Sequence, residues 1–186
     1  MKTILITAFE PFGGKETNAS AEALRSLPDQ IGGYDVQKQL LPVVFGKAAE
    51  SVRDDYDFIF LLGEAARKTV TPETRARNIR AARIPDNEGN QPENGKIISD
   101  GPEEYRTMLP VRETVEKMTE EGYRITVSDD AGAFVCNDTF YLVGTGSKAP
   151  VGFIHVPVIR MDGIAETVCR FIELAVSHES GGRDGR

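Results

Sequence analysis

The chain has 186 residues, which is long enough for one domain with a sizeable core and short for two. Its net charge of −7 argues against nucleic acid as the main partner, because phosphate binding needs clustered lysine and arginine. No apolar run reaches the roughly 18 residues that a membrane-spanning helix needs, so we expect no membrane partner. We find no secretory signal and therefore expect a cytoplasmic protein whose two cysteines stay reduced.

Strand-like and helix-like segments alternate along the chain, which is typical of a layered α/β domain. In chain order the predicted elements are strand 2–8, helix 19–27, a strand within 36–45, helix 46–54, strand 58–63, helix 111–122, strand 125–128, helix 134–143, strand 151–158 and helix 162–178. Asn18 is predicted to cap the first helix. Residues 1–178 are expected to form one domain, and the polar tail 179–186 is expected to be disordered.

Residues 78–102 interrupt this alternation with a segment that is dense in Asn, Asp, Gly and Pro. A long loop of this kind is usually functional or mobile. Residues 86–90, DNEGN, resemble the start of a calcium-binding loop, but Gln91 and Ile97 stand where such a loop needs Gly and Glu. The sequence also lacks a cluster of His and Cys, and we expect neither a metal ion nor another cofactor.

The two cysteines have different surroundings. Apolar residues recur at helical spacing on both sides of Cys169, which places it on the apolar face of a helix and predicts a buried structural thiol. Cys136 follows a turn that contains Gly132 and stands in the first turn of a predicted helix. The N–H groups and the positive dipole end of a helix start lower the pKa of a thiol and favour the thiolate. Position alone leaves two interpretations of Cys136 open, a nucleophile and a small buried side chain.

A thiol nucleophile normally needs a base, and histidine is the usual one. His178 stands at the polar end of the last helix and is expected to be solvated. His155 stands near the end of an apolar strand, where α/β sheets place their sites, and is the candidate base, with a core histidine as the alternative. A third group usually orients such a pair. Glu73 and Asp86 flank or enter the irregular segment, but spacing does not choose between them.

Five groups of segments follow one another in a specific order. They are TAFEPFGG with Asn18-Ala-Ser, then LPVVF, then LGEAAR with PETRARN, then ARIPDNEGNQP with DGP and LPV, and finally AGAFVCN with FY and GFIHVP. Together they span residues 4–157, nearly the whole domain, and RIPDNEGNQP, AGAFVCN and GFIHVP are highly specific. This set resembles the pyroglutamyl peptidase I family of cysteine peptidases, also called pyrrolidone-carboxylate peptidases.

The resemblance implies a fold and an activity. The fold is a single three-layer α/β/α domain with a twisted mixed central sheet. The activity is removal of an N-terminal pyroglutamyl residue from peptides, with Cys136 as the nucleophile and His155 as the general base. Both Glu73 and Asp86 match positions at which the family's third catalytic group has been placed. A homo-oligomer, either a tetramer or a dimer, is also implied.

The family's pocket carries over onto matching positions of this chain. Phe9 and Phe12 would enclose the lactam ring, Asn18 would hydrogen-bond the substrate, and Arg83 would lie close to the reacting carbonyl. The other substrate-binding positions are Val43, Glu64, Ile84, Phe134 and Val135. A lactam has an apolar ring with one N–H and two carbonyls nearby, which suits aromatic walls with a few fixed polar partners.

The chain departs from the family pattern at several acidic residues. Glu64 stands where family members often have Gln, and a carboxylate cannot donate a hydrogen bond unless it is protonated. Asp129, Asp130 and Asp138 lie near Cys136 in sequence, and any of the four carboxylates, Glu64 included, would raise the pKa of the thiol if it lies close. These departures leave an alternative open, a catalytically weak relative that binds pyroglutamyl peptides or a related lactam without efficient turnover.

Overall fold

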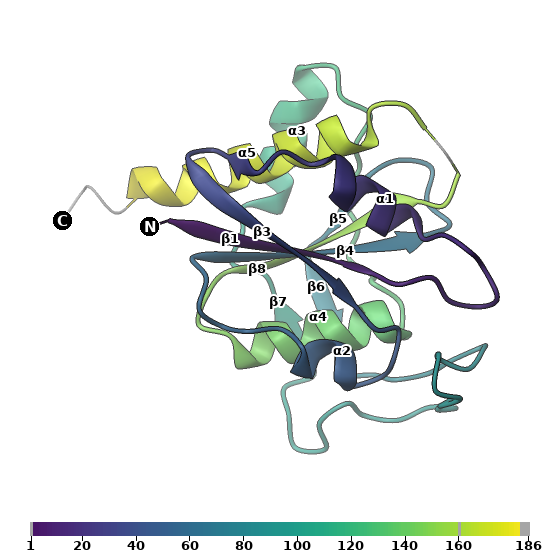
Figure 1. The fold of residues 1–186 in the computed structure, drawn as a ribbon. Helices are drawn as coiled ribbons and strands as arrows, with labels where there is room; N and C mark the ends of the chain where they lie inside the picture. The colour runs from purple at the N-terminus through teal and green to yellow at the C-terminus, as the bar shows by residue number, and fades with distance from the viewer. Residues whose placement is uncertain (1, 160, 183–186) are drawn as a thin grey trace.

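Strands and helices alternate along the chain much as the sequence predicts (Figure 1). The computed structural model describes residues 2–159 and 161–182. In chain order its elements are β1 (Thr3–Phe9), α1 (Ala19–Ser26), β2 (Gln30–Ile31), β3 (Tyr34–Leu41), α2 (Lys47–Glu50), β4 (Phe58–Ala65), β5 (Thr71–Glu73), β6 (Arg75–Arg77), β7 (Glu104–Arg106), α3 (Val111–Glu120), α4 (Val135–Gly146), β8 (Val151–Pro157) and α5 (Ile164–Gly182).

Six of the strands form one central sheet in the order β2-β3-β1-β4-β8-β5. The four inner strands β3, β1, β4 and β8 run parallel to one another. The edge strands β2 and β5 run antiparallel to their neighbours. The sheet is therefore mixed, as predicted. Parallel strands bring their carboxyl ends to one edge of the sheet, where sites of α/β proteins lie.

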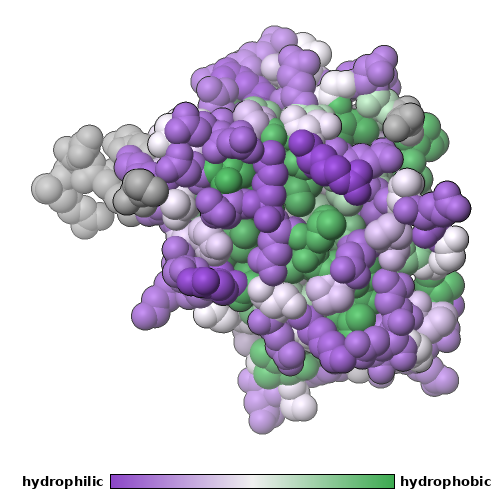
Figure 2. All heavy atoms as spheres, in the orientation of Figure 1, coloured by the Kyte–Doolittle hydropathy of each residue, from purple (hydrophilic) through white to green (hydrophobic). Residues whose placement is uncertain are grey.

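Side chains that alternate along the strands fill two separate cores, one on each face of the sheet. In β1, Ile4 and Ile6 belong to one core, whereas Leu5 and Phe9 belong to the other. Helices α1, α3 and α5 cover the first face, and α2 and α4 cover the second (Figure 1). This arrangement confirms the predicted three-layer α/β/α fold. On the face shown in Figure 2, hydrophilic residues cover most of the surface and apolar residues are visible between them.

The prediction of a strand at residues 125–128 is wrong. This segment runs beside β5 and makes only two isolated bridges, Val70 with Ile125 and Glu73 with Ser128. The N–H groups of Thr126 and Ser128 donate to β5 and the residue before it, but Pro72 has no N–H to return the next bond. A proline in the middle of β5 therefore interrupts the ladder that would have made this segment a regular strand.

The last helix is longer than predicted, because α5 continues to Gly182. Part of the tail that we expected to be disordered therefore belongs to this helix. Residues 183–186 lie outside the described residues, so the expected disorder of the tail end stays a prediction.

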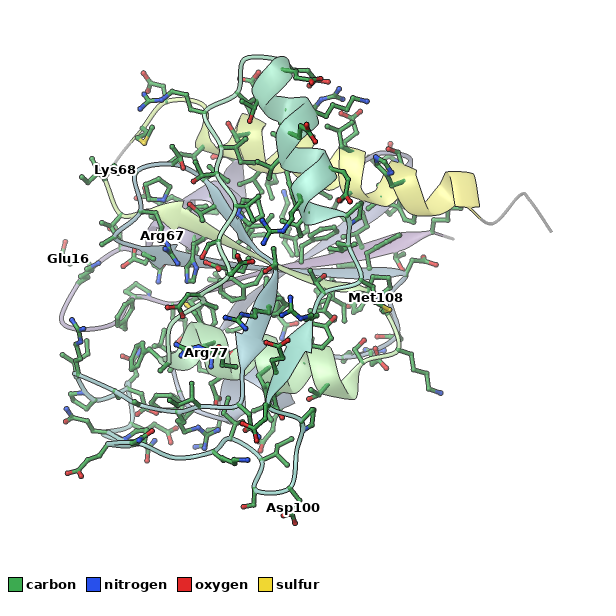
Figure 3. All side chains as sticks on the ribbon, turned by 180° about the vertical axis from the view of Figure 1, so that it is seen from behind. Glu16, Arg67, Lys68, Arg77, Asp100 and Met108 are labelled. Atoms are coloured by element: carbon green, nitrogen blue, oxygen red, sulfur yellow. The ribbon has the colours of Figure 1, made fainter. Side chains whose placement is uncertain are left out.

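The irregular segment that begins near residue 78 is held in place by a buried amide. Asn78 Nδ2 donates to the carbonyl of Ile98 at 2.8 Å, and its Oδ1 accepts from the N–H groups of Ile97 at 2.8 Å and Ile98 at 3.0 Å. Strands β6 and β7 pair with each other at the two ends of this segment. Asp100 lies at its outer end, far from the sheet (Figure 3). The composition allowed a mobile loop here, but these hydrogen bonds and strand pairs give the segment an ordered backbone.

Candidate active site

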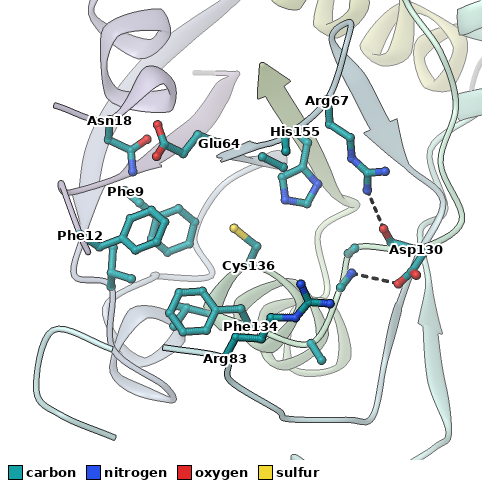
Figure 4. Close-up of a pocket in the computed structure, with 17 residues that line it drawn as sticks. Phe9, Phe12, Asn18, Glu64, Arg67, Arg83, Asp130, Phe134, Cys136 and His155 are labelled. Atoms are coloured by element: carbon teal, nitrogen blue, oxygen red, sulfur yellow. Dashed lines mark hydrogen bonds between the residues drawn. The ribbon is translucent and has the colours of Figure 1, made fainter. Parts of the chain in front are cut away.

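A cavity of about 530 Å³ opens at the carboxyl ends of β1, β4 and β8 (Figure 4). Most of the residues predicted for the site line this cavity: Phe9, Phe12, Asn18, Val43, Glu64, Arg83, Phe134, Val135, Cys136 and His155. These residues come from segments far apart in sequence, and the parallel strand order brings them together. Among the predicted site residues, Glu73, Ile84 and Asp86 do not line it.

Cys136 is the second residue of α4, which begins at Val135 after an extended Phe134. Its Sγ lies against the backbone of Gly63 in β4, because a Cβ added to Gly63 would lie only 2.7 Å from the sulfur. Gly63 is the registered partner of His155 in β8. Registered partners on neighbouring strands project to the same face of a sheet. The thiol and the imidazole therefore lie over the same face of the sheet, and Gly63 neighbours both of them.

His155 is joined to a buried carboxylate. Its Nδ1 lies 2.7 Å from Glu73 Oε1, and the two side chains are 3% and 0% exposed. The carboxylate accepts a hydrogen bond from Nδ1–H, which leaves Nε2 as the nitrogen able to take a proton. The ring of Phe153 packs 4.8 Å from the imidazole, centroid to centroid. The histidine is thus fixed in both orientation and tautomer.

Arg67 is a site residue that the sequence reasoning did not identify. Its Nη2 lies 3.0 Å from Glu73 Oε1 and 2.7 Å from the carbonyl of Asp130 (Figure 4). Arg67 and His155 therefore share one carboxylate oxygen, while Glu73 Oε2 is buried without a hydrogen-bond partner among the described residues. No spacing signal marks Arg67, because its partners lie 6 and 63 positions away.

The pKa of the Cys136 thiol is raised to about 12, in the direction expected of nearby carboxylates and against the direction expected of a helix start. Burial is the largest cause, and the negative charges of Glu73 and Glu64 add to it. The field of a helix start acts in the opposite direction. A thiol with a pKa of about 12 is protonated at neutral pH. Its reactivity depends on a base that removes the proton during attack.

The aspartates that are near Cys136 in sequence are bound by arginines. The hydrogen bond from the Thr74 hydroxyl, and next the bonds from Arg112 Nη2 to both carboxylate oxygens, hold the pKa of Asp129 below its usual value. Asp130 pairs with Arg77 at 2.9 Å. Asp138 is fully buried and forms an ion pair with Arg80, and burial raises its pKa.

None of these three aspartates is a cause of the raised pKa of Cys136. The two carboxylates that do act on the thiol, Glu73 and Glu64, come from β5 and β4. Acidic residues next to a cysteine in sequence are therefore a poor guide to the charges that it meets in the fold.

Asp86 organises a loop and does not contact His155. It is 5% exposed, and it accepts hydrogen bonds from the N–H groups of Phe45, Glu88 and Asn90 at 2.9–3.0 Å. Burial acts to raise its pKa, but the side-chain hydrogen bond from Asn90 and these backbone bonds together hold it below its usual value. Of the two candidates for the third group, the fold brings only Glu73 to the histidine.

Aromatic rings form one wall of the cavity. Phe134 packs edge-on against Phe45 at 5.4 Å and lies 5.8 Å from Phe12, between ring centroids. Phe9 is buried at the end of β1. Ile84 does not line the cavity; it is 44% exposed and its Cδ1 lies at the backbone of Gly13 on the rim. The wall therefore resembles a slot for a flat apolar group.

Asn18 caps α1, as predicted. Its Oδ1 accepts from the N–H of Ser20 at 2.9 Å and from the Ser20 hydroxyl at 2.7 Å, while its Nδ2 donates to the carbonyl of Glu10 at 3.0 Å. Both lone pairs of the amide oxygen are thus used within the protein. The second N–H of Nδ2 is the side-chain group that remains for a ligand in the cavity.

Within the described residues, no group of three or more His, Cys, Asp and Glu side chains is arranged to hold a metal ion. Over the same part of the chain, no helix has the length and apolar character needed to cross a membrane.

Comparison with known proteins identifies the family. A family model described as pyroglutamyl peptidase matches residues 2–176. The chain is 41% identical over 172 residues to a pyrrolidone-carboxylate peptidase of Bacillus thuringiensis (strain Al Hakam), covering 86% of this chain and 80% of that protein. It is 40% identical over 167 residues to one of Staphylococcus saprophyticus, covering 84% and 78%.

A solved structure gives the same answer for the fold. The crystal structure of Bacillus amyloliquefaciens pyroglutamyl peptidase I superposes with a TM-score of 0.89 at 36% identity, covering 96% of this chain and 98% of that one. Sequence, fold and cavity therefore point to one conclusion. The chain belongs to the pyroglutamyl peptidase family.

Proposed function

We propose that this protein is a cysteine peptidase that hydrolyses the bond after an N-terminal pyroglutamyl residue of peptides. Family membership supports the reaction, and one structural observation supports its chemistry. The Cys136 thiol and the His155 imidazole lie over the same face of the sheet, and His155 Nδ1 is 2.7 Å from the buried Glu73 carboxylate. This is the relation of nucleophile, base and orienting group that covalent peptidases use.

In the proposed mechanism, His155 Nε2 takes the thiol proton as Cys136 Sγ attacks the scissile carbonyl carbon. The tetrahedral intermediate collapses when the imidazolium protonates the leaving amine, which leaves a thioester between Cys136 and the pyroglutamyl group. Water, deprotonated by the same histidine, then hydrolyses the thioester. Glu73 stabilises the imidazolium, and the first-turn N–H of Cys136, which has no acceptor within its helix, can bind the oxyanion.

The cavity suits the acyl group of this substrate. Phe9, Phe12 and Phe134 offer apolar faces to the lactam ring. A carboxylate oxygen of Glu64 can accept from the lactam N–H. Arg83 lines the same cavity, where its guanidinium can donate to a substrate carbonyl. Two acidic residues line the cavity, Glu64 and Asp130, and each is paired with a cation of the protein, Lys15 and Arg77 respectively. Neither is therefore an unpaired anchor for an α-ammonium, which pyroglutamate lacks.

The decisive experiment compares two amides that differ only in ring closure. We expect the protein to release the dye from a pyroglutamyl amide under reducing conditions and to leave the open-chain glutaminyl amide intact. The glutaminyl substrate carries an ammonium and cannot fit a lactam slot. Equal turnover of both substrates would contradict the proposed specificity. Absence of turnover, together with retained binding of pyroglutamate, would favour the alternative of a binding protein.

Gly63→Ala should lower kcat/KM for the pyroglutamyl amide by about 10²-fold, the cost of a displacement near 1 Å at a reacting atom. The added Cβ would lie 2.7 Å from Cys136 Sγ and 2.8 Å from a ring carbon of Phe153, so the thiol has to move. Gly146→Ala is the matched control, because nothing lies within 4 Å of its added Cβ. Steady-state kinetics of both variants test this, and activity of Gly63→Ala within about threefold of the control would contradict it.

We further propose that the enzyme acts in the cytoplasm and assembles as a homo-oligomer. The need for a reduced thiol at Cys136 supports the first point. The second rests on the resemblance to the family alone, and both remain predictions.

A further inference from the structure

Glu64 places a carboxylate inside a cavity whose proposed ligand is neutral. Its side chain is only 4% exposed. Its Oε2 accepts from the N–H of Ala19 at the start of α1, at 2.8 Å. Its Oε1 lies 2.5 Å from Nζ of Lys15. A buried carboxylate is costly unless charge and hydrogen bonds compensate it, and here a single lysine supplies the compensating charge.

Lys15 belongs to the segment that joins β1 to α1 and forms part of the cavity. The same segment carries Phe12, and Lys15 Nζ lies 5.5 Å from the centroid of that ring. The ammonium therefore contacts the carboxylate on β4 and the aromatic wall at the same time. Lys15 itself is 49% exposed and does not line the cavity, but it reaches from the surface to Glu64, which does.

Other contacts fix the ends of this segment and leave its middle to Lys15. Asn18 Nδ2 donates a hydrogen bond to the carbonyl of Glu10, and Asn87 Nδ2 donates one to the carbonyl of Pro11. Beyond these, the side-chain bond that ties residues 13–17 to the sheet is the one from Lys15 to Glu64. Breaking it would release the segment that carries Phe12.

We propose that Lys15 is a positioning residue for the acyl pocket, which rests on the function proposed above. It neutralises Glu64, so that this carboxylate accepts the lactam N–H without repelling the lactam carbonyl. It also holds the Phe12 ring against the cavity. Both effects act on substrate binding, because Lys15 contacts no group that reacts.

Lys15→Met should raise KM for the pyroglutamyl amide about tenfold and change kcat less than about threefold, the pattern of lost ground-state binding. Lys15→Arg should restore KM, because a guanidinium can reach the same carboxylate. Lys47→Met is the matched control: Lys47 is also half exposed and paired with a glutamate, but its partner Glu88 does not line the cavity, whereas Glu64 does. Its KM should equal that of the wild type.

A double-mutant cycle tests the charge directly. Once Glu64→Gln has removed the carboxylate, adding Lys15→Met should raise KM by less than about threefold. An equal increase of KM with and without Glu64 would show that Lys15 acts elsewhere. KM values for Lys15→Met and Lys47→Met that agree within error would overturn the proposal.

A binding readout separates this inference from the proposed reaction. Free pyroglutamate should raise the Tm of the wild type and of Lys47→Met, and raise that of Lys15→Met less at the same concentration. If wild type turns over substrate but Lys15→Met behaves as the control in both assays, the inference alone fails. If wild type shows a pyroglutamate shift without turnover, the proposed reaction fails while a reduced shift in Lys15→Met still supports the inference. No shift and no turnover in the wild type would overturn both.

Discussion

Cys136→Ala should reduce turnover of a pyroglutamyl amide by about 10⁴-fold or more, because loss of a covalent nucleophile removes the acyl-enzyme route altogether. The fold should be preserved, since Cys136 lines the cavity and, as a residue, packs only partly into the core. Initial rates at saturating substrate under reducing conditions measure the loss, and the Tm of each variant verifies that the protein is folded.

Cys169→Ala provides the matched control. Cys169 packs against the core beneath α5, on the opposite face of the sheet from the cavity. Its pKa is also raised, first by burial and then by Glu173. The two thiols therefore share a raised pKa but differ in having a base nearby. Turnover by Cys169→Ala should stay within about twofold of the wild type, whereas residual activity above about 1% in Cys136→Ala would reject Cys136 as the nucleophile.

The fold could be predicted well because its strands are apolar and its helices begin at recognisable residues. The run FIFLLG reads as a buried strand and is one in β4. Asn18 reads as a helix cap and is one. The failure at residues 125–128 has a specific cause, because the partner strand supplies Pro72 opposite it. A segment's own pattern carries no information about whether its neighbour can return its hydrogen bonds.

Only part of the candidate site could be predicted from the sequence. The motifs located Cys136 and His155, but Glu73 and His155 are 82 positions apart and no spacing rule joins them. The sheet register does so, because β5 pairs with β8. The direction of the Cys136 pKa could not be decided for the same reason, because the helix start and nearby carboxylates act on it in opposite directions. A helix start is visible in sequence, whereas burial and the approach of Glu64 and Glu73 depend on the whole fold.

The raised pKa also restricts the resting state of the proposed nucleophile. A preformed thiolate–imidazolium pair would need the thiol to ionise next to two carboxylates. The groups that act on Cys136 are Glu73 and Glu64, and the cations nearest to them are Arg67 and Lys15. Arg67 binds the same oxygen of Glu73 that His155 uses. The Glu73 carboxylate therefore already has a permanent cation, Arg67, beside it before His155 becomes charged.

Glu73→Gln should consequently change two reactions of Cys136 in opposite directions. Turnover of the pyroglutamyl amide should fall by about 10²–10⁴-fold, because a neutral amide no longer stabilises the imidazolium formed during attack. Alkylation by iodoacetamide at pH 8 should become faster, because the negative charge of Glu73 raises the thiol pKa and its removal lowers that pKa. A lower thiol pKa at fixed pH means a larger fraction of thiolate, so the rate of alkylation should increase.

Asp86→Asn separates the two candidate third groups. Asp86 holds backbone N–H groups of a loop and is not a cause of the Cys136 pKa, so this variant should lower the Tm and leave the alkylation rate unchanged. The pair of variants thus compares loss of a carboxylate at the histidine with loss of one in a loop. If alkylation of Glu73→Gln slowed together with turnover, the resting enzyme would contain a thiolate–imidazolium pair that Glu73 stabilises. In that case the protonated thiol inferred here would be wrong, while the assignment of Glu73 as the third group would stand.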